Sequence, residues 1–187
     1  MFTTMINLIF YFSISIMTIF SAEENISTLG WQIVDDVVMG GRSNGNFEID
    51  ENGYGVFSGY VSLENNGGFS SLRGRTETVA MSEFDFVSLR IKGDGKSYQF
   101  RIKSSTYDRH SYIAHFQTDG SWQTINIALS DMYPAFRGRK LSMPNYPSES
   151  MAEIAFLIGN KKPESFQLII DEIVFGQQKL SSSTQKR

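Results

Sequence analysis

Residues 87–103 decide the fold class, and they read Val87-Ser88-Leu89-Arg90-Ile91-Lys92-Gly93-Asp94-Gly95-Lys96-Ser97-Tyr98-Gln99-Phe100-Arg101-Ile102-Lys103. Apolar and polar side chains alternate in both flanking runs, which is typical of a β-strand with one buried and one solvated face. An Asp-Gly pair between two such runs is a frequent hairpin turn. This stretch therefore predicts two antiparallel strands that pair with each other.

The same pattern recurs along the chain. Turns are expected at Asn52-Gly53, at Asp119-Gly120 and in the Asn/Gly-rich residues 65–68. Strands are expected at residues 31–34, 47–50, 54–63, 69–75, 87–92, 98–103, 111–117, 122–128, 153–158 and 166–175. Many short strands at near-regular spacing indicate an all-β, jelly-roll-like antiparallel β-sandwich. Residues 129–150 contain three prolines and are expected to form a long loop of the kind that often carries function.

Composition narrows the classes of function. The chain has 187 residues and a formal charge of −3, so one domain is expected and no overall positive field favours nucleic acid. There is no cysteine, which excludes disulfides, thiolate metal sites and cysteine nucleophiles. Glycine and aromatic residues are abundant, as in sheet proteins with many turns.

The N-terminal residues form a separate block. Residues 5–20 are apolar and uncharged, and no Lys or Arg precedes Arg42. Residues 1–22 are therefore expected to be a signal peptide or a membrane anchor, with a packed N-terminal segment as the third reading. Residues 23–178 would then form a single β-sandwich domain and residues 179–187 a flexible polar tail. The predicted location is exported or membrane-associated, with mitochondrial or cytoplasmic as the alternative.

The sequence contains two features that could suggest catalysis, but neither has the neighbouring structure that catalysis would require. Gly41-Arg42-Ser43-Asn44-Gly45 matches a nucleophile elbow, but that motif needs a helix after it and a strand is expected here. His110 and His115 lie five apart on an extended segment and would point to opposite faces. We therefore predict no enzyme activity, no cofactor and no metal site.

Two glycine-rich loops, residues 34–43 and residues 65–75, are the best candidates for binding. Asp35 and Asp36 could bond the local backbone and pair with Arg73 or Arg75, or the loops could form a concavity for a partner's polar groups. Phe136 and Arg137 lie in the long loop and combine an aromatic ring with a cation, as interface hot spots do. The predicted partner-binding residues are Asp35, Asp36, Met39, Gly40, Gly41, Ser43, Asn66, Gly67, Gly68, Phe69, Ser71, Arg73, Arg75, Phe136 and Arg137.

A basic stripe is predicted on the polar faces of the first two strands. It consists of Arg90, Lys92, Arg101 and Lys103. A solvated outer face of an antiparallel sheet explains such a stripe, and a docking surface for an acidic partner is the other reading.

Five motifs, taken in order, resemble the complex I intermediate-associated protein family. They are residues 35–43, 66–73, 93–98, 116–122 and 136–138, and the resemblance extends over about residues 29–176. The resemblance implies a galactose-binding-like β-sandwich without catalytic residues. It also implies a chaperone role, because mitochondrial members of that family assist assembly of the respiratory NADH:ubiquinone oxidoreductase.

Two functions follow as hypotheses. The first is a non-enzymatic module that holds a protein partner, such as a membrane-complex assembly intermediate, through the glycine-rich loops. The second is an exported carbohydrate-binding module. Its candidate aromatic platforms are Trp31, Trp122, Tyr107 and Tyr133, although both tryptophans lie in strand patterns and are expected in the core.

Overall fold

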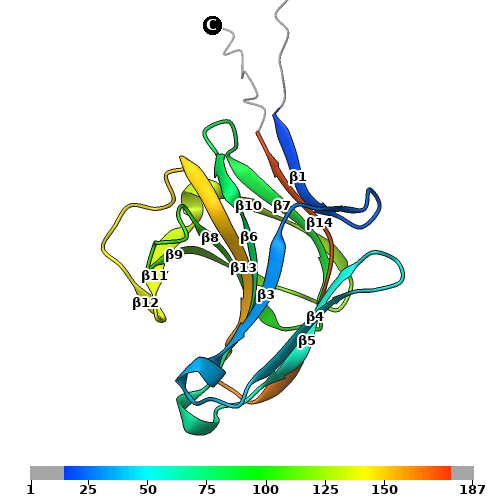
Figure 1. The fold of residues 1–187 in the computed structure, drawn as a ribbon, viewed down its shortest axis with the longest axis vertical. Coiled ribbons are helices and arrows are strands. Elements are labelled where there is room, and N and C mark those ends of the chain that lie inside the picture. The colour runs from blue at the N-terminus through cyan, green and yellow to red at the C-terminus, as the bar shows by residue number, and fades with distance from the viewer. Residues whose placement is uncertain (1–14, 178–187) are drawn as a thin grey trace, which may run out of the picture.

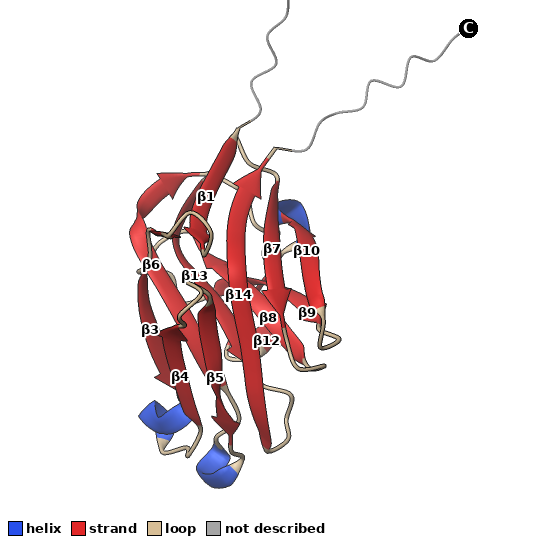
Figure 2. Ribbon diagram, turned by 90° about the vertical axis from the view of Figure 1, so that its right-hand side faces the viewer, coloured by secondary structure: helices blue, strands red, loops and turns tan. Residues whose placement is uncertain are grey.

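The computed structural model describes residues 15–177, without the side chains of Val38 and Met39. Two antiparallel sheets pack face to face, with short 3-10 helices at their ends (Figures 1 and 2). The all-β, jelly-roll-like sandwich expected from the sequence is confirmed. Most of the predicted N-terminal block and the predicted C-terminal tail lie outside the described residues.

Sheet A has seven strands, in the spatial order β10-β7-β14-β1-β2, and the β4–β5 hairpin joins it through β14. Strand β14 is long enough to pair with β5 along its first half and with β1 along its second half. The strands of sheet A are β1 (Ile16–Ser21), β2 (Ile26–Ser27), β4 (Asn44–Ile49), β5 (Gly55–Val61), β7 (Phe86–Lys92), β10 (Trp122–Ala128) and β14 (Glu164–Gly176).

Sheet B also has seven strands, in the order β12-β11-β9-β8-β13-β6-β3. The strands of sheet B are β3 (Gly30–Asp35), β6 (Ser70–Ala80), β8 (Ser97–Lys103), β9 (Ser111–Gln117), β11 (Tyr133–Phe136), β12 (Arg139–Lys140) and β13 (Ser150–Ile158). The 3-10 helices are η1 (Asp36–Met39), η2 (Glu64–Asn66) and η3 (Leu129–Asp131). The long loop expected at residues 129–150 thus contains a short hairpin that extends sheet B.

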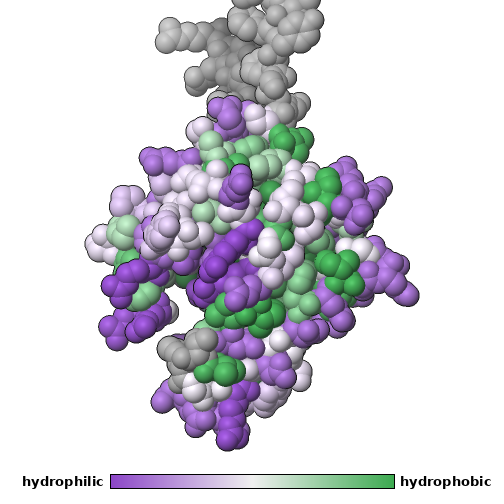
Figure 3. All heavy atoms as spheres, in the orientation of Figure 1, coloured by the Kyte–Doolittle hydropathy of each residue, from purple (hydrophilic) through white to green (hydrophobic). Residues whose placement is uncertain are grey.

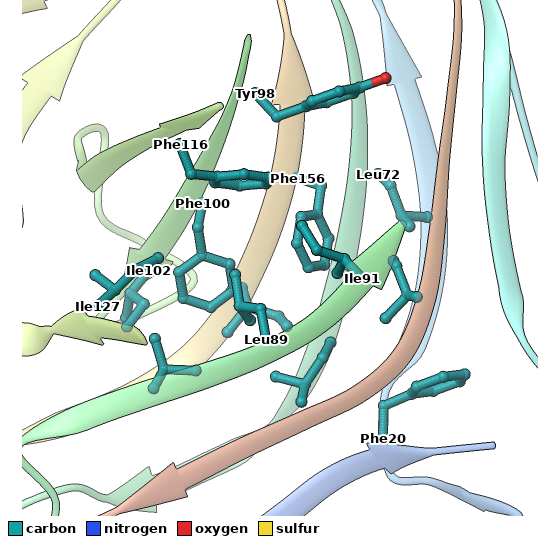
Figure 4. Close-up of a cluster of buried hydrophobic side chains, with 14 of the residues drawn as sticks. Phe20, Leu72, Leu89, Ile91, Tyr98, Phe100, Ile102, Phe116, Ile127 and Phe156 are labelled. Atoms are coloured by element: carbon teal, nitrogen blue, oxygen red, sulfur yellow. The ribbon is translucent and has the colours of Figure 1, made fainter. Parts of the chain in front are cut away.

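Side chains alternate between the faces of each strand, as the sequence pattern requires. Hydrophilic side chains cover much of the face seen in Figure 3, although apolar areas also lie on it. Apolar side chains fill the space between the sheets (Figure 4). Tyr98, Phe100, Phe116 and Phe156 form a connected aromatic cluster in that core, with ring centroids 5.5–6.4 Å apart. The Tyr98 hydroxyl donates to the Asp94 carboxylate at 2.9 Å, so even this buried polar group has a partner.

Three of the four predicted hairpins are wrong, including the one at residues 65–68, because β5 and β6 on either side of it lie in different sheets. Strands β7 and β8 flank Asp94-Gly95 but lie in different sheets, and β9 and β10 around Asp119-Gly120 do likewise. Only the Asn52-Gly53 turn joins strands that pair, namely β4 and β5. Gly53, Gly95 and Gly120 all have positive φ, so the turn chemistry was predicted correctly. The pairing was not, because alternation shows that a strand has a buried face but does not show which sheet it joins.

The predicted basic stripe is split by the same crossover. Arg90 and Lys92 lie on sheet A, and Arg101 and Lys103 lie on sheet B. Arg90 forms an ion pair with Asp171 on its own sheet at 2.9 Å. The four residues therefore do not form one surface.

Residues 16–21, assigned from the sequence to the N-terminal block, form β1 inside the sandwich. Strand β1 pairs with residues 172–176 of β14, and the Phe20 side chain is 2% exposed. The sandwich thus begins before the predicted boundary at residue 23. The physical reason is that an apolar run of this kind suits a buried strand as well as a signal-peptide core. Within residues 15–177, no helix combines the length and apolar character that crossing a membrane requires.

Candidate functional site

The two predicted binding loops meet at Asp36, the first residue of η1. The Asp36 side chain is fully buried. Its carboxylate accepts hydrogen bonds from the Ser43 amide at 3.0 Å and the Ser43 hydroxyl at 2.5 Å. It also accepts from the backbone amides of Gly68 at 2.5 Å and Phe69 at 3.2 Å in the second loop. We call Asp36 and these donors the Asp36 clamp.

Hydrogen bonding keeps the Asp36 carboxylate ionised. Burial alone raises the pKa of this carboxyl group, but hydrogen bonds from Ser43, Gly68 and Phe69 outweigh burial, and the net pKa is lowered. Glycine is needed around the carboxylate for space. A Cβ atom on Gly41 would lie 2.2 Å from one carboxylate oxygen, and one on Gly67 would lie 2.6 Å from the other. The glycine-rich composition of both loops thus fits the closed clamp.

The predicted pairing of Asp35 or Asp36 with an arginine is wrong. Asp35 accepts a hydrogen bond from the Gly45 amide at 2.9 Å, and Arg75 pairs with Glu153 at 2.9 Å. The partners of Asp36 are backbone amides and the Ser43 hydroxyl, because the two loops fold closely around its carboxylate.

Several predicted partner-binding residues are buried rather than available at the surface of the loops. Asp36, Gly41, Ser43 and Ser71 do not reach the surface. Gly40 and Asn66 are exposed at the tips of their loops, and the Val37 side chain in the first loop is 58% exposed. The prediction for the Met39 side chain lies outside what the structure describes.

A groove of about 470 Å³ lies on the outer face of sheet B, next to the clamp. Five of the predicted residues line this groove: Gly68, Phe69, Arg73, Phe136 and Arg137. The structure thus brings part of the second glycine-rich loop and part of the long loop to one surface, although their sequence positions are far apart. The lining residues that the sequence analysis did not include among partner-binding residues are Gln99, Arg101, Lys103, Arg109, Ser111, Ala135, Gly138, Leu157 and Gly159.

Strand register sets the floor of the groove. Arg73 on β6 and Arg101 on β8 both pair with Ala155 on the strand between them. Their backbones are therefore two strand spacings apart, about 10 Å. The small Ala155 side chain leaves the two long side chains to cover the floor. Strongly hydrophilic side chains gather over β8 and β13 in the space-filling view, and again over β12 (Figure 3).

The groove is strongly cationic. Its five basic residues are Arg73, Arg101, Lys103, Arg109 and Arg137. Within residues 15–177, none of them forms an ion pair with a carboxylate. The carboxylate nearest in register is Glu153, which pairs with Lys103 across the strands, but its ion-pair partner is Arg75. The positive charge of the groove is therefore not balanced by ion pairs within the described residues.

The pKa of Arg101 is affected by burial and by the excess of positive charge in the groove. Burial is the main cause that lowers the pKa of its guanidinium to about 10, and the positive charge of Arg73 adds to the effect. The group is still a cation at neutral pH. Its guanidinium donates hydrogen bonds to the Gln99 side-chain oxygen, which is a neutral acceptor.

Aromatic rings at the edge of the groove are stacked with cations. The guanidinium carbons of Arg109 and Arg137 lie 5.0 Å and 5.4 Å from the Phe136 ring centroid. Tyr133 stacks with the His115 ring at 6.2 Å, and the Lys140 ammonium lies 5.2 Å from its centroid. Cation–π contacts of this kind hold the cations over the rings at the groove edge.

The candidate sugar-binding aromatics have different fates. Trp31 was expected in the core, and it is partly buried, with its ring packed against Phe20 and Phe47. Trp122 is not in the core: it is 36% exposed on sheet A and packs against Tyr54, because its strand lies at the sheet edge. Tyr107 is 94% exposed.

The histidines remain apart in the structure. His115 bonds to the Tyr133 hydroxyl at 2.9 Å, and burial together with the charge of Arg101 lowers the pKa of its imidazole. His110 packs edge-on against Tyr112. Within the described part of the chain, no group of three or more His, Asp or Glu side chains is placed to hold a metal ion.

Known proteins match this chain at the level of family and of fold. Residues 19–170 match the family described as Complex I intermediate-associated protein 30 (CIA30). Among solved structures, the family 11 carbohydrate-binding module of the cellulosomal cellulase Lic26A-Cel5E of Clostridium thermocellum is similar, with a TM-score of 0.61 and 16% identity over 87% of this chain and 94% of that one. A family 29 carbohydrate-binding module has a TM-score of 0.57 and 7% identity, over 88% and 90% of the two chains. At these identities the structural similarity concerns the fold.

Proposed function

The chain belongs to the complex I intermediate-associated protein 30 family, and from this premise we propose that it is a non-enzymatic module that holds a protein partner during assembly of a membrane complex. The groove on sheet B is its main contact surface, and the exposed tips of the glycine-rich loops extend that surface. The Asp36 clamp gives these loops a fixed shape.

One observation carries this proposal: the groove joins residues 68, 69 and 73 to residues 136 and 137, and its cations lack carboxylate partners among the described residues. Arginine and aromatic side chains in a concave surface are typical of interface hot spots.

The test blocks the groove and leaves the clamp intact. Ser111 lines the groove from β9, so Ser111→Trp places a large ring inside it. Cells lacking the protein are complemented with wild type or with the variant, and assembly intermediates of respiratory complex I are resolved on native gels. We expect wild type to restore the intermediates and the variant to fail. Full restoration by a folded Ser111→Trp variant would contradict the proposal.

A second candidate function is an exported carbohydrate-binding module. The fold favours it, because carbohydrate-binding modules share this fold, and Tyr133 is one of the aromatic residues predicted as a sugar platform. Affinity electrophoresis in gels containing mixed-linkage β-glucan tests it. Retarded migration that Tyr133→Ala abolishes would support this function, and unretarded migration of the wild type would count against it.

The location of the protein stays a prediction. We propose export or membrane association from the apolar residues 5–20. N-terminal sequencing of protein purified from fractionated cells tests this. A chain that starts near Glu23 indicates cleavage, whereas an intact N-terminus in the membrane fraction indicates an anchor.

A further inference from the structure

We propose that the groove on sheet B binds an acidic polypeptide segment whose carboxylates pair with Arg73, Arg101 and Lys103. This inference rests on the proposed function and names the chemical class of its partner. It is argued from the charge, the hydrogen-bonding capacity and the aromatic contacts of the groove.

Charge is the first argument. The groove contains four arginines and one lysine, and the carboxylate next to it in strand register, Glu153, is 3% exposed and bonded to Arg75. Like charges on a partly desolvated surface repel each other. The charge of Arg73 accordingly contributes, after burial, to the lowered pKa of Arg101. An anionic ligand would relieve this repulsion and gain charge-assisted hydrogen bonds.

Hydrogen-bonding capacity is the second argument. Arg and Lys side chains donate but cannot accept. The side-chain acceptors in the groove are Gln99, whose oxygen already accepts from Arg101, and the Ser111 hydroxyl. A neutral sugar presents hydroxyl groups that need acceptors as well as donors. A carboxylate presents acceptors alone and matches the forked guanidinium.

The aromatic contacts distinguish a polypeptide from an acidic glycan. Sugar rings bind by stacking on open aromatic faces, but cations already lie over Phe136 and Tyr133. Apolar side chains line the groove together with the cations, namely Phe69, Ala135 and Leu157. A peptide that alternates carboxylates with apolar side chains can meet both kinds of lining residue.

Sheet A provides a matched control surface. Arg90 is bonded to the Asp171 carboxylate, and its guanidinium lies 5.6 Å from the Trp122 ring centroid. Arg90 and Lys92 belong to a strand of the same length and alternation as Arg101 and Lys103. Replacing them removes the same number of charges from the chain without altering the groove.

The experiment measures fluorescence anisotropy of a short labelled peptide in which Glu alternates with Leu or Ser. The same peptide with Gln in place of Glu is the neutral comparison. We expect the Glu peptide to bind at low salt, and Arg73→Gln/Arg101→Gln to raise its Kd by at least about tenfold. The control Arg90→Gln/Lys92→Gln should change Kd by less than about twofold, and added salt should weaken binding. Thermal melting verifies that both variants are folded.

Three outcomes would overturn the inference. They are equal binding of the Gln peptide, an unchanged Kd in the folded Arg73→Gln/Arg101→Gln variant, and tighter binding of a sulfated or uronic-acid oligosaccharide that displaces the peptide. Complementation separates the inference from the proposed function. If Ser111→Trp fails to complement while Arg73→Gln/Arg101→Gln succeeds, the function stands and the acidic partner is wrong. If the peptide binds and both variants complement, the groove binds acids but the proposed function is wrong.

Discussion

The Asp36 clamp and the groove on sheet B are neighbours, but they differ in whether their charged groups have partners within the protein. In the clamp, one carboxylate is fully buried and accepts four hydrogen bonds from its own chain. In the groove, five cations are without ion-pair partners among residues 15–177. Gly68 and Phe69 belong to both regions, since their amides bond Asp36 and they line the groove.

The difference separates structural polar groups from those available to a ligand. A charge that the fold itself satisfies contributes to stability, and removing it leaves buried donors without partners. A charge without a partner in the fold lowers stability, and such charges often belong to a site that binds a ligand. Mutations in the clamp should therefore change folding, whereas mutations in the groove should change binding.

Asp36→Ala should have the largest effect. It leaves the Ser43 and Gly68 amides and their neighbours without an acceptor in a buried site, so we expect unfolding free energy to fall by about 4 kcal/mol. Urea denaturation measures it. Asp50→Ala is the control, because Asp50 also accepts two backbone hydrogen bonds but lies in an exposed hairpin turn, and its loss should cost about 1 kcal/mol. Equal losses in the two variants would contradict the role of the clamp.

Gly41→Ala should have the second largest effect. The new methyl group would lie 2.2 Å from one oxygen of the Asp36 carboxylate, which four hydrogen bonds hold in place, and we expect a loss of about 2–3 kcal/mol. Gly40→Ala is the neighbouring control. Gly40 has φ near +90° but open space around it, so only backbone strain of about 1 kcal/mol is expected. Denaturation curves that rank the two variants in the reverse order would show that space around Asp36 is not limiting.

Arg101→Met should change stability little while it weakens peptide binding. Removing a partly buried cation next to Arg73 relieves repulsion and retains an apolar stem over Ala155, so the change in unfolding free energy should lie within about 1 kcal/mol in either direction. The same urea titration measures it. A loss as large as that of Asp36→Ala would mean that the groove, like the clamp, is satisfied internally.

Acidification should have the smallest effect through His115. The pKa of its imidazole is lower in the folded chain than its usual value of about 6.5, so the unfolded chain binds more protons below that pH. Stability should therefore fall as pH decreases through about 6.5, and the fall should be shallower in His115→Gln. Unfolding midpoints at a series of pH values above the range of carboxylate titration measure this. Identical slopes in both proteins would contradict the shift.

Sequence alone predicted the fold class and most strands, because alternation of apolar side chains is a local property. It did not assign strands to sheets. Thr118 shows what was missing: its hydroxyl accepts from the Gly95 and Lys96 amides, which holds together the two loops that cross between sheets. Nothing in the local pattern of either loop encodes that contact.

The site was predicted in part for the same reason. Arg73, Phe136 and Arg137 could be singled out from their composition, and Arg101 and Lys103 from strand alternation. Their convergence depends on β13 lying between β6 and β8, which only the tertiary structure supplies. Asp36 was assigned to partner binding, because a buried clamp and an exposed loop have the same glycine-rich composition.

Strand β1 would link any cleavage of the N-terminus to the tendency to aggregate. Cleavage after Ala22 would remove the neighbour of β14 along residues 172–176 and leave that stretch of backbone donors and acceptors open to water. An open edge of this kind is a template for pairing with another chain. Trimming would also remove the Phe20 ring that packs against Trp31. A chain that keeps residues 16–21 stays closed at this edge, so proteolytic processing would set how readily the molecule pairs with copies of itself.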